Sequence, residues 1–220
     1  MGGHKPTPTE DSPLRGANPM DFVTPSEFVD LPSKGRYPEG HPLRGEETIE
    51  INYMTAKDED ILTSRSLLKK GIAIDRLINN LIKDQRIDPA HLYIGDRNAI
   101  IIHARASAYG QDYKTNVSCP NCGENSKFKF DLAKTDVYNG DQIEDTKIKD
   151  LENGTFEVEM PLAKMTAVIR PLMGFDELEI LKQSKGKDAM ENLVTKQMRR
   201  FIVSVNGYDD DQTIDYVVNN

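Results

Sequence analysis

The fold of the first half of the chain is decided by residues 72–82, which read IAIDRLINNLI. Large apolar side chains recur there at spacings of three, one, three and one, which is the period of a helix with one buried face. These positions are Ile74, Leu77, Ile78, Leu81 and Ile82. The pattern predicts an amphipathic helix.

Further helices are expected on both sides of this segment. Thr55 followed by Asp58 resembles a capping box, and the apolar positions after it continue to Gly71, so one helix is expected there. Asp88-Pro89 is typical of the start of a short helix, and Asp96 is expected to cap a longer one that ends at Tyr109-Gly110. The region from about residue 55 to 110 is therefore predicted to be a compact helical module.

Short strands are expected elsewhere, because apolar and polar residues alternate over several short runs. These runs are Thr48–Met54, Tyr113–Val117, Phe128–Leu132, Phe156–Met160 and Ala167–Arg170. The second and third flank a turn and predict a small hairpin, and the last two predict another. The fold class is therefore α+β, with small antiparallel hairpins added to the helical module.

The C-terminal region is predicted to be mainly helical. Asp176 is expected to open an acidic helix, and the longest helical pattern follows, from Met190 to Val205. Residues 213–218 are expected to form a last strand or a frayed turn. Four regions follow for the whole chain: an extended or disordered arm over 1–30, a main α+β domain over 31–132, an acidic linker over 133–154, and a β-hairpin with a helical segment over 155–220.

Composition limits the classes of function. The 220 residues carry a net charge of −8 with a pI near 5.1, which argues against a nucleic-acid coat protein because phosphate binding requires clustered Lys and Arg. No apolar run reaches the roughly 18 to 20 residues that cross a bilayer, and the first 30 residues lack the apolar centre of a signal peptide. Protein partners are the expectation, with no nucleic acid and no membrane.

The two cysteines, Cys119 and Cys122, lie in a Cys-Pro-Asn-Cys-Gly turn. Two thiolates at this spacing can occupy two corners of a zinc tetrahedron, but structural zinc needs four ligands. No second cysteine pair follows, so the turn is half of a metal site. The alternatives are a turn that binds no metal, or a metal site that is completed by one of the scattered histidines or by a second chain. A thioredoxin-like site is disfavoured because a strand, rather than a helix, follows the turn.

The arm carries an unusual set of large apolar residues for a segment rich in Pro and Gly. They are Phe22, Val23, Phe28, Val29 and Leu31. A purely solvated tail would rarely carry five such residues so close together, so they are candidate contacts with a neighbouring subunit.

The sequence contains no recognisable catalytic set. His103 lies in an expected helix without a nucleophile or carboxylate at a supporting spacing, and helix capping accounts for Asp96 next to Arg97. Glycine-rich phosphate loops and nucleophile elbows are also missing from the sequence. A non-enzymatic protein without a cofactor is expected, apart from zinc at the cysteine pair.

Six segments in one order resemble the baseplate hub assembly proteins of T4-like phages. They are Leu31-Pro32-Ser33-Lys34-Gly35 with Tyr37-Pro38, Met54-Thr55-Ala56 with Glu59-Asp60-Ile61-Leu62-Thr63-Ser64, Lys70-Gly71 with Ile74-Asp75, Gly95-Asp96-Arg97-Asn98-Ala99-Ile100, Tyr109-Gly110 with Tyr113, and Cys119-Pro120-Asn121-Cys122. The resemblance is strongest over residues 31–132 and weaker over 155–207.

The resemblance implies a structural subunit or an assembly factor (chaperone) of the baseplate hub, without catalytic residues. It implies other hub proteins as partners, a homo-oligomer around the tail axis, and a location in the virion tail or in the host cytoplasm during assembly. It also implies longer relatives that continue past the position of Asn220 with a second Cys-x-x-Cys pair. The alternative is a phage-encoded zinc-knuckle regulator that binds host polymerase or nucleic acid, against which the net charge of −8 counts.

Overall fold

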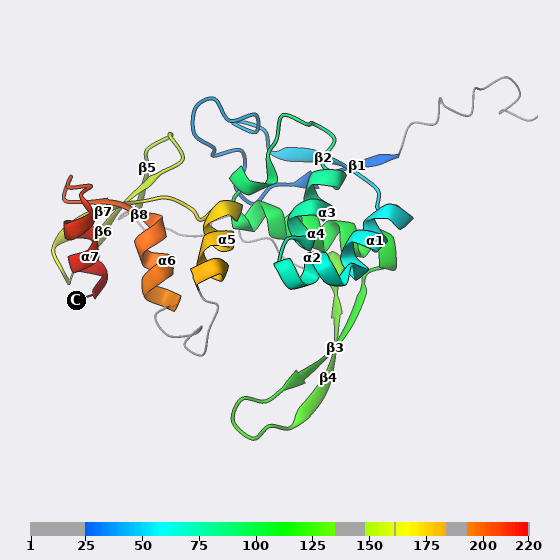
Figure 1. Cartoon of the computed structure of the whole chain (residues 1–220). Helices are drawn as coiled ribbons and strands as arrows, with labels where there is room; N and C mark the ends of the chain where they lie inside the picture. The colour runs from blue at the N-terminus through cyan, green and yellow to red at the C-terminus, as the bar shows by residue number, and fades with distance from the viewer. Residues whose placement is uncertain (1–24, 135–147, 161, 184–192, 220) are drawn as a thin grey trace, which may run out of the picture.

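The structure, a computed structural model, describes residues 25–134, 148–160, 162–183 and 193–219. It is an α+β protein, as expected, with helices and three small antiparallel sheets (Figure 1). The helices and strands in chain order are β1 (Ser26–Asp30), β2 (Thr48–Asn52), α1 (Ala56–Thr63), α2 (Arg65–Lys70), α3 (Ala73–Leu81), the 3-10 turn η2 (Pro89–His91), α4 (Ile94–Tyr109), β3 (Asp112–Ser118), β4 (Asn125–Asp131), the 3-10 turn η3 (Leu132–Lys134), β5 (Ile148–Asp150), β6 (Phe156–Met160), β7 (Met165–Ile169), α5 (Gly174–Gln183), α6 (Leu193–Phe201), β8 (Ile202–Val205) and α7 (Asp211–Asn219).

The predicted hairpins are present, and two of the sheets contain more than was expected. Strand β2 pairs with β1, which lies inside the segment expected to be an arm. Strands β6 and β7 form the second hairpin, and they are flanked by β5 and β8 in a four-stranded sheet of order β5-β6-β7-β8. Strand β5 lies within the segment expected to be a linker. For β1 and β8 the pairing partner is distant in sequence, so a local pattern does not reveal it.

The N-terminal core lies between the β1–β2 sheet and the helices α3 and α4. The amphipathic helix predicted from residues 72–82 is confirmed as α3, with Leu77, Ile78 and Leu81 buried. Ile51 on β2 and Ile100 on α4 are fully buried against the same core. Burying one such side chain stabilises the fold by about 1.5 to 3 kcal/mol, so this shared core determines the packing of the module.

Asp96 was expected to cap α4, and that expectation is wrong. The helix begins at Ile94, and Tyr93 occupies the cap position, so Asp96 lies in the first turn with its carboxylate fully buried. The hydroxyl of Tyr37 donates to Asp96 Oδ2 at 2.6 Å and the Ser33 N–H donates to Oδ1 at 2.9 Å. The carboxylate therefore fixes the loop after β1 onto α4.

Tyr37 itself is packed between two rings. His41 stacks on one side with ring centroids 4.0 Å apart, and Tyr93 stacks on the other side at 4.3 Å. Burial, together with the nearby carboxylate of Asp96, raises the pKa of the Tyr37 hydroxyl far above its ordinary value. Burial also raises the pKa of Tyr93, to about 12. Both hydroxyls therefore stay protonated and act as donors.

Arg97 lies where the N-terminal part of the molecule meets helix α5. Its guanidinium donates to Asp75 Oδ1 at 2.6 Å and to the Pro89 carbonyl at 2.8 Å, and its side chain is buried. It therefore does not pair with its neighbour Asp96. Gly174, at the start of α5, lies so close that a Cβ there would be 2.7 Å from Arg97 Nη1. Backbone bonds between Gly174 and Leu92, and between Leu172 and Ile94, complete the junction.

The helix expected over residues 55–71 is divided in two. The capping box is present, since the Asp58 carboxylate accepts from the Thr55 N–H at 2.8 Å. The chain becomes extended at Ser64, which ends α1 and caps α2 by accepting from the Leu67 N–H. Gly71 ends α2 in the left-handed conformation, as predicted.

Two expectations for the C-terminal region are wrong. The helical pattern expected to run to Val205 ends at Phe201, because the β-branched Ile202 and its neighbours form β8 and pair with β7. Met190, at the start of that pattern, lies outside the described residues. Residues 213–218 belong to helix α7, where Asp210 caps the first turn by accepting from the Thr213 N–H at 2.9 Å.

A smaller core holds the C-terminal part together. Ile202 and Val205 on β8 and Ile214 on α7 are buried there, and half-buried side chains surround them. Helix α5 contacts both α4 and α6, so it lies between the two parts (Figure 1). Within the described ranges, no helix combines the length and the apolar character needed to cross a membrane.

Candidate protein interface

The hairpin β3–β4 projects from the helical part of the molecule as a separate ribbon (Figure 1). Its two strands pair over seven residues each, from Asp112 opposite Asp131 to Ser118 opposite Asn125. Within the described part of the chain, neither strand pairs with any other. A two-stranded ribbon on its own is marginally stable in water, so a ribbon of this kind is expected to pack against something.

The two faces of the ribbon differ in chemistry. Residues directly opposite each other in an antiparallel pair share a face, so the register places Tyr113 beside Phe130 and Thr115 beside Phe128. Val117 follows on the same side because side chains alternate along a strand. We call this side, formed by Tyr113, Val117, Phe128 and Phe130, the aromatic face.

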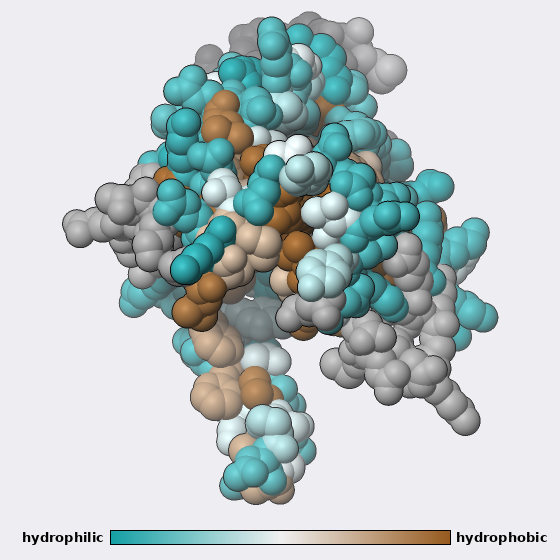
Figure 2. Space-filling view, turned by 90° about the vertical axis from the view of Figure 1, so that its left-hand side faces the viewer, coloured by the Kyte–Doolittle hydropathy of each residue, from teal (hydrophilic) through white to brown (hydrophobic). Residues whose placement is uncertain are grey.

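The aromatic face is exposed. Phe128 and Phe130 are 47% and 49% exposed, and their rings stack with centroids 6.2 Å apart. Tyr113 and Val117 are exposed to a similar extent. The space-filling view shows apolar side chains along the projecting hairpin (Figure 2). An exposed stripe of large apolar residues on a projecting element is typical of a protein-binding surface.

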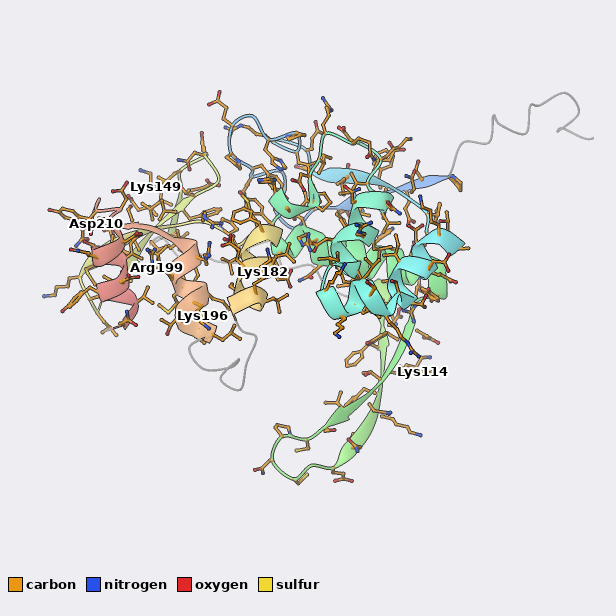
Figure 3. All side chains as sticks on the ribbon, viewed as in Figure 1. Lys114, Lys149, Lys182, Lys196, Arg199 and Asp210 are labelled. Atoms are coloured by element: carbon orange, nitrogen blue, oxygen red, sulfur yellow. The ribbon has the colours of Figure 1, made fainter. Side chains whose placement is uncertain are left out.

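The opposite side of the ribbon, which we call the polar face, carries lysines. Lys129 pairs with Asp112 at 2.9 Å. Lys114, on the part of the hairpin nearest the body, and Lys127 share this face (Figure 3). The ribbon therefore has one side suited to an apolar partner and one suited to water.

The base of the hairpin is anchored to α4. The Leu132 N–H donates to the Gln111 carbonyl at 2.9 Å, which closes the ribbon where it leaves the body. The guanidinium of Arg105 lies 4.9 Å from the ring centre of Tyr109 and 5.8 Å from that of Tyr113. Cation–π contacts of this kind hold the first part of the aromatic face at a fixed angle to the helix.

A groove of about 540 Å³ runs beside the base of the hairpin, between β1, α4 and η3. Phe28 lines it and is 65% exposed. Glu27 lies next to it, accepts from the Ser107 hydroxyl at 2.7 Å, and approaches His103 Nε2 at 3.2 Å. His103 therefore has a carboxylate partner at the surface, which its spacing in the sequence did not reveal.

The predicted partner contacts are distributed differently from what the sequence suggested. Val29 and Leu31 are each 3% exposed and belong to the N-terminal core, so their apolar contacts are made within the chain. Phe28 points to the other side of β1 and remains exposed, because neighbours on a strand face opposite sides. Phe22 and Val23 lie outside the described residues. Phe28 is thus the candidate contact that the structure leaves accessible.

Cys119 and Cys122 lie at the tip of the hairpin, Cys119 half-buried and Cys122 exposed. In the parts of the chain that the structure describes, no group of three or more His, Cys, Asp or Glu side chains is placed to hold a metal ion. The two thiols are therefore brought together with each other and with none of the histidines described.

A second cavity, of about 520 Å³, lies in the C-terminal part between α6 and α7. Arg170, Lys196, Arg199 and Arg200 line it, and two of them are marked in Figure 3. Each of these arginines faces a carboxylate; Arg170, for example, binds Asp176 through two bonds of 2.7 Å. The three arginines of this cavity are therefore each paired with a carboxylate of the same chain.

The aromatic face was not singled out in the sequence, although its signal was there. Tyr113 and Val117 alternate with polar residues on one strand, as do Phe128 and Phe130 on the other. This alternation predicts a strand with one apolar side, but it does not say whether the chain covers that side. The structure shows that it is uncovered among the described residues.

Comparison with known proteins identifies the family of this chain. A family model described as T4 bacteriophage base plate protein matches residues 25–217. A comparison with curated proteins found no match, and neither did a comparison with solved structures. The match covers nearly all of the described residues, the projecting hairpin among them, so the chain belongs to the family of T4 bacteriophage base plate proteins.

Proposed function

We propose that this baseplate protein is a structural or assembly component of the baseplate hub, and that it works through protein–protein contacts without catalysis. The observation that carries the proposal is the exposed aromatic face on a projecting two-stranded ribbon. In such a position the face contributes little to the fold of its own chain. A neighbouring protein that covers it would remove the apolar surface from water and stabilise the ribbon.

Phe28 and its groove extend the same proposal to the body of the molecule. Both features flank the base of the hairpin, since the groove is lined by residues of β1, α4 and η3. One partner could therefore contact the aromatic face and Phe28 together. Interfaces have buried aromatic anchors at their centre and a polar rim, and the contacts of Glu27 with Ser107 and His103 would belong to the rim.

Partners in this proposal are other baseplate proteins, and the location is the virion tail or an assembly intermediate in the host. The buried polar groups of the chain support a non-catalytic role, because the Asp96, Arg97 and Asp176 side chains are each held by partners within the fold. Groups that are held in this way position the backbone and are not presented to a substrate.

The proposal is tested by photo-crosslinking in phage-infected cells. A photoreactive phenylalanine analogue placed at Phe128 should capture baseplate proteins, which mass spectrometry would identify. The matched control places the same analogue at Lys127, the next residue on the same strand but on the polar face, where few crosslinks are expected. Equal capture at both positions would show that the aromatic face is not the contact.

A further inference from the structure

The tip of the hairpin is a tightly ordered turn. The Gly123 N–H donates to the Cys119 carbonyl at 2.9 Å, and the Cys119 N–H donates to the Glu124 carbonyl at 2.8 Å. Gly123 has φ of +74°, in the left-handed region where a side chain would be strained. These bonds fix the backbone between the two cysteines, so the positions of the thiols are set by the turn.

The two cysteine side chains of this turn contact each other. The backbone N–H groups of Asn121 and Cys122 and the Cys122 thiol are hydrogen-bonded to the Cys119 sulfur, so the turn holds the two thiols next to each other. Thiolates are the form that binds soft metal ions. The turn therefore presents a pair of sulfur ligands in an arrangement suited to two corners of a zinc tetrahedron.

The other two corners have no candidate in the described part of the same chain. No third His, Cys, Asp or Glu joins the pair there, and the tip lies at the far end of the ribbon from the helices (Figure 1). A structural zinc ion requires four protein ligands. Within the described residues the site is therefore half complete, and a second molecule can supply the other half.

We propose that two copies of this chain share one zinc ion, with Cys119 and Cys122 of each hairpin as its four ligands. A twofold axis through the metal brings an identical pair of thiolates from the second hairpin, so the same surface serves both partners. The length of the ribbon holds the two bodies apart while the tips meet. The aromatic face lies along the side of the ribbon and is left open to a different protein.

Charge on the ribbon supports the same arrangement. Zinc with four thiolates carries a net negative charge, which nearby cations favour. The polar face carries Lys114 and Lys127 beside Lys129. Lys127 lies nearer the tip than Lys114, so two hairpins that meet at their tips would bring the two Lys127 side chains toward the metal.

The experiment uses the full chain, purified with a phosphine reductant and titrated with zinc. Light scattering after size exclusion gives the mass, and elemental analysis gives the zinc content. The expected result is one zinc ion per two chains, a doubling of the mass, and return to the monomer with a chelator. Cobalt in place of zinc should give the absorption of a tetrahedral site with four sulfur ligands.

Two variants test whether the cysteines are responsible for zinc binding and for the doubling of the mass. Replacing both cysteines, Cys119→Ser with Cys122→Ser, should abolish zinc binding and the doubling of mass. The control Asn121→Ser lies between them, keeps both thiols, and should behave as the unaltered chain. A monomer with one zinc ion, a chain that binds no zinc, or a dimer that persists with chelator or without the cysteines would each overturn the proposal.

Discussion

The N-terminal part and the C-terminal part of the molecule are stabilised in different ways. Fifteen buried residues form one apolar core in the first part, and fully buried polar groups such as Asp96 are fixed inside it. Among the described residues of the second part, three buried apolar residues form the core, and ion pairs at the surface join α6 to α7. Deep burial makes single contacts strong, whereas solvent screens ion pairs at a surface.

Asp96→Ala in the N-terminal part is expected to have the largest effect. The substitution leaves the Tyr37 hydroxyl and the Ser33 N–H without an acceptor in a buried region, which should lower the free energy of unfolding by about 2 to 4 kcal/mol. Denaturant titration measures it. The control, Asp60→Ala on the exposed side of α1, should change the free energy by less than about 0.5 kcal/mol. Equal effects would remove the distinction between buried and exposed carboxylates.

Gly174→Ala tests the junction between the two parts. The added methyl group would lie 2.7 Å from Arg97 Nη1 and 2.9 Å from the Pro89 carbonyl oxygen, so the buried arginine must move. A loss of about 1 to 3 kcal/mol is expected from overpacking. Gly95→Ala is the matched control: the nearest atom to its Cβ would be Pro32 Cβ at 3.8 Å. If Gly174→Ala is as harmless as the control, α5 does not depend on this contact.

Arg199→Met in the C-terminal part is expected to have the smallest effect. Arg199 pairs with Asp211 and, at 2.6 Å, with Asp215, but about a third of its side chain is exposed. The loss should be below about 1 kcal/mol and should shrink as salt is added. Thermal unfolding at two salt concentrations measures it, with Arg86→Met as the exposed control. A salt-independent loss as large as that of Asp96→Ala would contradict the comparison.

Local pattern was sufficient for the elements whose stability is local. The spacing of Leu77, Ile78 and Leu81 identified α3, and Gly110 marked the end of α4. It was insufficient for Ile202–Val205, because apolar β-branched residues suit a buried helix as well as a strand, and pairing with β7 decides between them.

The role of Asp96 could not be predicted for a related reason. An acidic residue near a helix start is usually explained by capping, and its actual partner Tyr37 lies 59 residues earlier in the chain. Val29 and Leu31 were expected to contact a neighbour because the segment before β2 resembled an arm. Their true partners are in the core of the same chain, which only the paired register of β1 and β2 reveals.

For the β3–β4 hairpin, the local structure was predicted from the sequence, but its exposure was not. Its strands and its cysteine turn were predicted correctly from alternation and from turn residues. That Phe128 and Phe130 would be exposed depends on how far the ribbon extends beyond the helices, which no local pattern contains. The cysteine pair could be proposed as half of a zinc site from its spacing, but its position at the tip of the hairpin is a property of the folded chain.

The measurement that tests the central claim most directly is quantitative mass spectrometry of baseplate intermediates purified from infected cells. Phage encoding the unaltered chain is compared with phage encoding Phe128→Ser and Phe130→Ser, and with phage encoding Lys127→Ser and Lys129→Ser on the polar face. We predict that the chain is found in intermediates with the unaltered and lysine variants and is lost with the phenylalanine variant, although that variant remains folded. Equal recovery of all three would contradict an interface at the aromatic face.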